Sequence, residues 1–210
     1  VQSAALISCL AWTSLANRDR VGGLVFGDQS HRDIRPRRSK HNVLELIRQL
    51  DHYSRLLDSP VASSSDQDPR SLASLLEKLL HIAKPGTAVY ISSDFHDFDE
   101  ECRKRLFQLA RHCEITLFMV SDPLEEQIPG KGRFWVTDGV RRQSLSAASH
   151  HGDALRQRIE RLAEVCGPLG IPLQRLSTDE HLLRLLRTLY GQQRRSKPST
   201  PSRATRGGGL

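Results

Sequence analysis

Serine and acidic side chains gather where an apolar run ends, in the stretch AVYISSDFHDFDEE at residues 88–101. Asp94 directly follows Ser92 and Ser93, and four more acids lie between Asp97 and Glu101. Hydroxyl and carboxylate oxygens are hard ligands of the kind that Mg²⁺ accepts in proteins. The stretch therefore raises two alternatives, a metal site at a strand end or a strand that leads into the acidic first turn of a helix.

The acids after Asp94 are placed to stabilise a helix. Asp97 and Asp99 precede an amphipathic segment, and Glu100 and Glu101 fall in its first turn. Carboxylates at a helix N-terminus bind free amides and interact favourably with the helix dipole, at about 0.3–1 kcal/mol each. We expect them to cap the following helix, which leaves Asp94 as the candidate ligand. The alternative for Asp94 is a structural role, in which it and its serines accept hydrogen bonds from the loop backbone.

A second group of acids follows the next apolar run. Asp122 and Pro123 end that run, and Glu125 and Glu126 come directly after them. Ligands of open α/β sheets bind outside the carboxyl ends of the strands. The loop is therefore expected either to form part of a partner-docking rim or, equally, to do no more than end the strand.

Apolar periodicity and chain breakers predict the elements that position these residues. The predicted helices span residues 1–17, 41–57, 71–83, 99–113 and 151–166, and Thr178 and Asp179 offer the cap of a last helix. The predicted strands span residues 20–28, 87–92 and 114–123, with a polar return strand to Pro36, a hairpin turning at Asp138-Gly139 and a final strand in IPLQRLST.

Strands that alternate with helices predict an α/β fold of three layers. We expect a mostly parallel sheet with helices on both faces, an antiparallel edge strand and an inserted β-hairpin. The first element is an apolar helix with no strand before it, and the chain opens at Val1. Because a crossover helix should follow a strand of the same sheet, we expect the first strand to be missing from this chain.

Composition is that of a globular domain. Of 210 residues, 38% are hydrophobic and 26% are charged, and no apolar run approaches the ~20 residues that a transmembrane helix needs. The net charge of +7 owes much to the tail from Arg194, which holds five basic residues and no acid. Its Ser, Pro and Gly content predicts disorder. Nucleic-acid binding remains an alternative, but no basic patch is interleaved with aromatic residues that would stack bases.

The cysteines also point to an ordinary soluble domain. Cys9, Cys102, Cys113 and Cys166 are scattered and form no CxxC pair. This pattern predicts buried, reduced thiols in a cytoplasmic protein rather than disulfides or a zinc site. The N-terminus shows no signal peptide.

Several segments, in order, resemble a known fold. VGGLVF at 21–26, the polar return strand to Pro36, ISSDF at 91–95 and the segment from His112 to Glu125 resemble the von Willebrand factor A-type fold. They resemble most closely the bacterial family known as domain of unknown function 58, whose members are often encoded beside MoxR-type AAA ATPases. The resemblance implies an A-type domain over residues 1–192, followed by a basic disordered tail at 193–210. In such folds the first strand lies between the strands at 20–28 and 87–92, so two apolar edges would face a gap here.

The resemblance also implies a metal site. A-type domains hold a divalent ion, suited to Mg²⁺, through Asp-x-Ser-x-Ser after the first strand, a threonine from a second loop and an aspartate after a later strand. Asp94 matches that aspartate, and Ser71 offers a hydroxyl near the threonine position, where Arg70 would oppose a cation. The first ligand set would precede Val1. We therefore expect Mg²⁺ in an intact parent protein, which can also carry a membrane anchor, and no cofactor in this chain.

The chain shows no enzyme motif. It has no Gly-x-Ser-x-Gly elbow, no phosphate-binding Gly-rich loop, and no Cys or Ser with a partner base. We predict a non-enzymatic protein–protein interaction module that works with a MoxR-type AAA ATPase and docks at the C-terminal end of the sheet. The predicted docking rim comprises Ser92, Ser93, Asp94, Asp122, Glu125 and Glu126. The alternative is a metal-dependent hydrolase, of the phosphatase or nuclease kind, that uses Asp94, Asp97 and Asp122.

Overall fold

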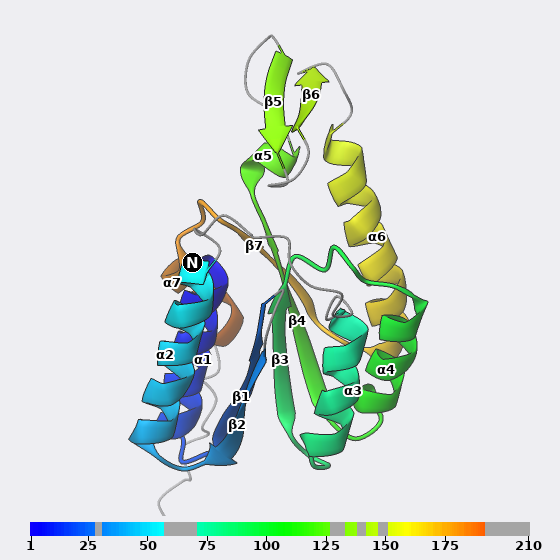
Figure 1. Cartoon of the computed structure of the whole chain (residues 1–210). Helices are drawn as coiled ribbons and strands as arrows, with labels where there is room; N and C mark the ends of the chain where they lie inside the picture. The colour runs from blue at the N-terminus through cyan, green and yellow to red at the C-terminus, as the bar shows by residue number, and fades with distance from the viewer. Residues whose placement is uncertain (28–30, 57–70, 127–132, 138–141, 147–150, 192–210) are drawn as a thin grey trace, which may run out of the picture. The chain divides into compact units, whose positions relative to one another are not determined.

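The computed structural model describes residues 1–27, 31–56, 71–126, 133–137, 142–146 and 151–191. The chain divides into two compact units, Val1–Glu180 and His181–Leu210. The first unit is an α/β structure whose helices and strands alternate along the chain (Figure 1). In the second unit, the described residues include helix α7 (Leu182–Tyr190).

A parallel sheet of three strands lies in the first unit. Its order is β3 (Ala88–Ser93), β4 (Glu114–Ser121) and β7 (Leu173–Ser177). Both pairings are parallel, as predicted. The strand β4 is the most apolar run of the chain and takes the central position, where neighbours on both edges bury it.

Three helices cover this sheet. Helix α3 (Leu72–Ile82) packs against α4 (Glu100–Ala110), and α4 contacts both β4 and α6 (His151–Leu169). Together they enclose a core with fully buried side chains, among them Leu106, Leu117, Leu162 and Cys166. The apolar faces of these helices therefore point into the core, as their sequence periodicity predicts.

The N-terminal part of the unit builds a second core. Helices α1 (Gln2–Ala16) and α2 (Lys40–Leu56) pack on the antiparallel pair β1 (Val21–Phe26) and β2 (His31–Arg37). The predicted polar return strand through Pro36 is confirmed as β2. A side chain at Gly22 would lie 2.6 Å from the carbonyl oxygen of Ile34, so the close approach of the two strands requires glycine there.

The two sheets are separate. Strand β1 pairs with β2 and β3 pairs with β4, and no ladder joins β1 to β3 in the described part of the chain. Helix α1 contacts both strands, and the Ser3 hydroxyl donates to the Ser92 hydroxyl at 2.8 Å. In Figure 1, α1 and α2 lie on one side of the strands and α3, α4 and α6 on the other, which gives the three layers.

Two shorter elements follow β4. Helix α5 (Pro123–Glu126) was not predicted, whereas the predicted hairpin is present as the antiparallel strands β5 (Arg133–Thr137) and β6 (Arg142–Ser146). The Asp138-Gly139 turn lies outside the described residues, as do Arg70 and the tail from Arg194.

The proposed cap of α7 is wrong. The residue that caps this helix is His181, whose side chain makes no capping hydrogen bond. The carboxylate of Asp179 instead accepts a hydrogen bond from the Ser177 hydroxyl at 2.5 Å, and the Thr178 hydroxyl donates to Asp122 at 2.7 Å. Both predicted caps are therefore used at the end of β7.

All four cysteines are free, and Cys102, Cys113 and Cys166 are buried as predicted, whereas Cys9 is only partly buried. Burial raises the pKa of the Cys102 thiol to about 12 and that of Cys166 to about 11. These thiols are protonated at neutral pH, because burial disfavours the thiolate.

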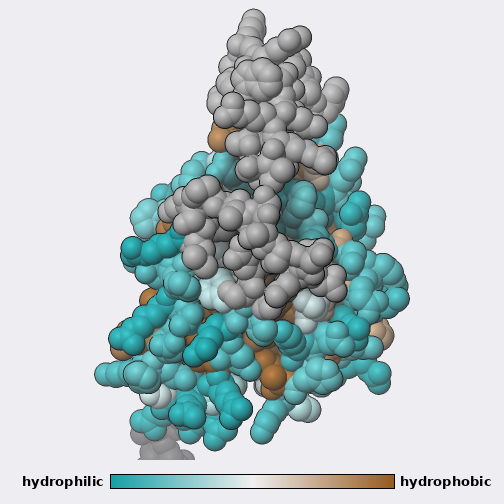
Figure 2. Space-filling model, in the orientation of Figure 1, coloured by the Kyte–Doolittle hydropathy of each residue, from teal (hydrophilic) through white to brown (hydrophobic). Residues whose placement is uncertain are grey.

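None of the described helices has the length and apolar character needed to cross a membrane. On the face drawn in Figure 2, hydrophilic residues predominate and hydrophobic ones form small separate patches.

Candidate functional site at the carboxyl ends of the parallel strands

The three parallel strands end at one edge of the sheet, where Ser93 lies one position before Asp94 and Ser121 pairs in register with Ser177. Asp94 and Asp122 therefore follow neighbouring strands at the same end, as predicted. The start of α1 lies here too, because the Gln2 side-chain amide donates to the carbonyl oxygens of Thr178 and Glu180 at 2.9 and 3.2 Å. We call the loops after β3 and β4, with the side chains that hold them, the carboxyl-end rim.

The loop after β3 is a tight turn held by its own side chains. The backbone amide of Phe95 donates to the Ser93 hydroxyl at 3.1 Å, and that of His96 donates to the Asp94 carboxylate at 3.2 Å. Phe95 has a φ of +53° and a side chain that is 2% exposed. Asp94 and Ser93 are thus placed as the structural alternative for this loop predicts.

Asp97 does not cap the helix that follows it. Its carboxylate accepts a 2.6 Å hydrogen bond from the backbone amide of Leu72, the first residue of α3. Asp99 is the residue that caps α4, through a 2.8 Å bond from the amide of Cys102. That backbone hydrogen bond holds the pKa of Asp99 below its ordinary value. The expected cap is therefore confirmed for Asp99 and wrong for Asp97, which reaches a neighbouring helix.

Ser71 is also engaged at the start of α3. Its hydroxyl oxygen accepts a hydrogen bond from the amide of Ser74 at 3.3 Å, which is the ordinary bond of an N-cap serine. In the described part of the chain, no three His, Cys, Asp or Glu side chains are grouped as metal ligands would be. Asp94 and Ser71, each occupied by backbone amides, do not fit a complete Mg²⁺ site by themselves.

The loop after β4 is held by Asp122. Its carboxylate accepts hydrogen bonds from the Leu124 amide at 2.9 Å and from the Thr178 hydroxyl at 2.7 Å. These two bonds, the first more than the second, lower the pKa of Asp122. The side chain of Glu125 in turn accepts from the Asp122 amide at 3.2 Å, and Glu126 forms an ion pair with Arg175 of β7.

Arg158 of α6 ties the two loops together. One of its terminal nitrogens, Nη1, donates to the Asp94 carbonyl oxygen at 3.3 Å and to the Glu125 carboxylate at 3.2 Å. The other, Nη2, lies 3.3 Å from Nδ1 of His96. An arginine can only donate, so Nδ1 of His96 is the acceptor. The Arg158 side chain is 15% exposed.

The sequence reasoning missed Arg158, although a signal was present. Leu155 and Leu162 are buried on α6, and Arg158 stands three residues after the first and four before the second. An arginine on the apolar stripe of a helix lies next to the body of the protein and needs a partner there.

An apolar side chain stands among these polar contacts. Leu124, the second residue of α5, is 58% exposed, while its neighbours Asp122 and Glu125 are fixed by hydrogen bonds. The carboxyl-end rim therefore combines an exposed leucine with charged groups whose positions are set.

The family described as "Protein of unknown function DUF58" matches residues 2–166, well over half of the chain. The chain belongs to the DUF58 family. The matched residues of this DUF58 chain include Asp94, Asp122 and Arg158, and they end before β7.

One solved structure supports the fold of the DUF58 chain. The crystal structure of conserved hypothetical protein BatB from Bacteroides thetaiotaomicron is similar, with a TM-score of 0.52 over 92% of this chain and 87% of that chain. The identity is 12%, so the likeness concerns the fold alone. No curated protein matches the chain.

Proposed function

We propose that this DUF58 chain is a non-enzymatic protein–protein interaction module that docks its partner at the carboxyl-end rim. The observation that carries the proposal is the 58% exposed Leu124 beside the fixed charges of Glu125 and Arg158. Protein interfaces combine apolar anchors with surrounding polar groups that fix register. Groups that are already held in place lose little conformational entropy when a partner binds.

The proposed partner class is a MoxR-type AAA ATPase, or a complex that such an ATPase assembles. This choice rests on the family and on its resemblance to von Willebrand factor A-type domains, which capture partners at the same end of their sheet. Mg²⁺ would be bound by an intact parent protein, with Asp94 as one ligand.

Site-specific photo-crosslinking to the purified MoxR-type ATPase of the same organism tests this proposal. p-Benzoylphenylalanine would replace Leu124 on the rim or, as a control, the exposed Glu114, the first residue of β4 at the opposite end of the sheet. We expect a covalent adduct from position 124 and none from position 114. Adducts from position 114 alone, or from neither position, would overturn the proposed docking site.

The competing function is a metal-dependent hydrolase that uses Asp94, Asp97 and Asp122. A phosphodiesterase and phosphatase screen with Mg²⁺ and Mn²⁺, combined with calorimetric titration of both ions, separates the two functions. Turnover that Asp94→Ala abolishes would replace the interaction module by an enzyme.

A further inference from the structure

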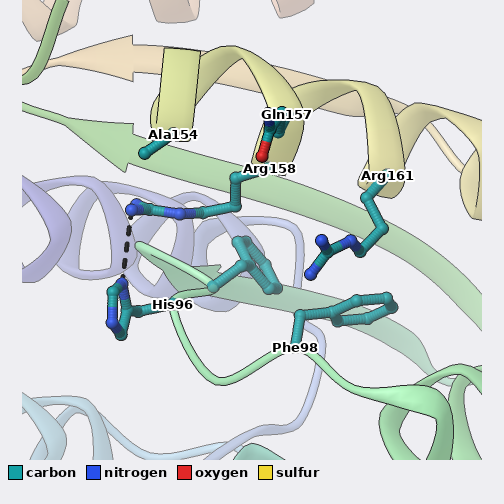
Figure 3. Close-up of a pocket in the computed structure, with 7 residues that line it drawn as sticks. His96, Phe98, Ala154, Gln157, Arg158 and Arg161 are labelled. Carbon is teal, nitrogen blue, oxygen red and sulfur yellow. Dashed lines mark hydrogen bonds between the residues drawn. The ribbon is translucent and has the colours of Figure 1, made fainter. Parts of the chain in front are cut away.

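A small pocket lies at the carboxyl-end rim, between the loop after β3 and helix α6. Its volume is about 170 Å³. Phe95, Phe98 and Ala154 supply its apolar lining, and its polar lining comes from His96, Gln157, Arg158 and Arg161. Figure 3 shows Arg158 and Arg161 projecting from α6 toward the loop that bears His96 and Phe98.

The charges of this pocket favour an anion. Two arginines line it, and no carboxylate is among its lining residues. Glu125 offsets the charge of Arg158 from outside the pocket, through the 3.2 Å ion pair. Arg161 is exposed and makes no hydrogen bond or ion pair with any residue that the structure describes. Within the described part of the chain its guanidinium is therefore unpaired, and its donors can bind a ligand.

The size of the pocket decides between classes of anion. An engineered cavity of about 150 Å³ takes up a benzene ring, whereas pockets for nucleotide-sized or drug-sized molecules measure roughly 300–1,000 Å³. A space of about 170 Å³ therefore holds the end of one side chain and is too small to enclose a whole nucleotide.

The chemistry of the lining suits a carboxylate on a short apolar stem. A guanidinium donates two parallel hydrogen bonds to a carboxylate, and the side-chain amide of Gln157 is a further donor. Phe95, Phe98 and Ala154 line the pocket, although the two phenylalanines are only 2% and 7% exposed, so the apolar surface open to the methylene groups of a stem is small.

We propose that this pocket, through Arg161 and Gln157, binds the carboxylate of a glutamate side chain on a protein partner. The proposal rests on the proposed interaction function and adds the chemistry of the partner. Arg158 lines the pocket and pairs with Glu125 in the loop after β4. A partner that binds near Glu125 is therefore close to the pocket as well.

The test is an NMR titration of the ¹⁵N-labelled chain, which observes the arginine Nε–H signals. The probe is the blocked tripeptide acetyl-Gly-Glu-Gly-amide, and its matched control carries Gln in place of Glu. We expect saturable shifts of the Arg161 Nε–H signal and of the Gln157 side-chain amide with the Glu peptide alone.

Variants of two arginines on one helix give the control. Arg161→Ala should weaken binding of the Glu peptide by about tenfold, because a charge-assisted hydrogen bond is lost. Arg161→Lys keeps the charge and should weaken it by about threefold, since the paired geometry is lost. Arg156→Ala, which removes an exposed arginine paired with Asp153 outside the pocket, should leave binding unchanged.

Three outcomes would overturn the proposal. They are shifts that saturate with inorganic phosphate but not with the Glu peptide, equal effects of Arg161→Ala and Arg156→Ala, and peptide binding that requires Mg²⁺ and shifts Asp94 instead. None of these bears on whether position 124 crosslinks to the ATPase. Failure of the pocket and failure of the docking site are therefore distinguishable.

Discussion

The Asp97 carboxylate lies 2.6 Å from the backbone amide of Leu72, so a residue in the loop after β3 holds the first turn of a helix that precedes it in the chain. Asp99, two positions on, holds the first turn of the helix that follows. One short loop therefore fixes the N-terminal ends of both α3 and α4, which pack against each other. The acids of this loop have mainly a structural use.

Replacing Asp97 should destabilise the protein. Asp97→Ala removes the acceptor of the Leu72 amide and should lower the free energy of unfolding by about 1 kcal/mol, whereas Asp97→Asn keeps an acceptor and should cost less. As a control, Asp51→Ala removes an exposed carboxylate of α2 and should change the free energy of unfolding by less than about 0.5 kcal/mol. Urea unfolding measures the stability of all three variants. Equal stability of the Asp97→Ala variant and the unsubstituted chain would contradict the bond between Asp97 and the Leu72 amide.

Stability should fall in acid through Asp99 and Asp122. Both pKa values are lowered in the folded state, chiefly by backbone amides that bind the charged carboxylate. The unfolded chain therefore takes up protons first as the pH falls. The stability from these groups is fully present above their unfolded pKa, about 3.9, and is lost as the pH drops through the folded values.

Urea midpoints measured across the range below about pH 5 follow this loss. The Asp99→Asn variant cannot titrate at this position and should show a flatter pH dependence than the parent. A parallel decline in the two proteins would mean that other groups carry the effect.

The ion pair of Arg158 with Glu125 should contribute to stability. A double-mutant cycle with Arg158→Gln and Glu125→Gln should give a coupling energy of about 1 kcal/mol, since the arginine is 15% exposed. The same cycle for Arg156 and Asp153, which are 70% and 44% exposed, should give less than about 0.5 kcal/mol. Equal couplings in the two cycles would show that Arg158 does not tie the rim.

Because Phe95 has a positive φ, its glycine variant should be more stable than its alanine variant, which reverses the usual order of stability. Either substitution removes a buried ring at a cost of about 3–5 kcal/mol. Glycine is normally the less stable of the two, but at a φ of +53° it avoids a backbone strain of about 1–2 kcal/mol. Thermal unfolding should therefore rank Phe95→Gly above Phe95→Ala.

The exposed Arg18 gives the same comparison without loss of core contacts. Its φ is +65°, so Arg18→Gly should be more stable than Arg18→Ala. If alanine is the more stable residue at both positions, the left-handed backbone is not what these residues adopt.

The unpaired edges of β1 and β3 should promote self-association. In the described part of the chain, β1 pairs with β2 alone and β3 pairs with β4 alone, so each strand has one unpaired edge. An unpaired edge can template pairing with a strand of another molecule. Light scattering after gel filtration should show a mass that rises with concentration, and Leu24→Lys on β1 should reduce it, because a charge on an edge strand opposes pairing. A concentration-independent monomer with an ordinary cooperative melt would show that the edges are filled in another way.

Much of the architecture follows from local patterns. The central place of β4 follows from its continuous apolar run, and the polar edge strand from Pro36, which cannot donate to a ladder. That Asp94 and Asp122 share one end follows from the parallel direction of the strands they end. These features depend on periodicity and chain direction, which a sequence displays.

The contacts that sequence reasoning missed join residues far apart in the chain. Asp97 bonds to Leu72, 25 positions away, although a helix of its own begins closer by. Thr178 bonds to Asp122 across 56 positions, whereas the local pattern predicts that it caps the nearer helix. Arg158 meets Asp94 across 64 positions. Local capping rules rank the nearest amide first, whereas the fold decides which amide is within reach.

The two hydrophobic cores of the first unit lie on sheets that share no ladder in the residues that the structure describes, and α1 contacts strands of both. The two cores are therefore joined through side chains, those of α1 and the pair of Lys78 on α3 with His31 on β2, whose nitrogens lie 2.8 Å apart, rather than through a shared ladder. Partial unfolding that releases the N-terminal core can leave the core around β4 intact. If the two cores unfold separately in this way, the calorimetric and van't Hoff enthalpies of unfolding diverge.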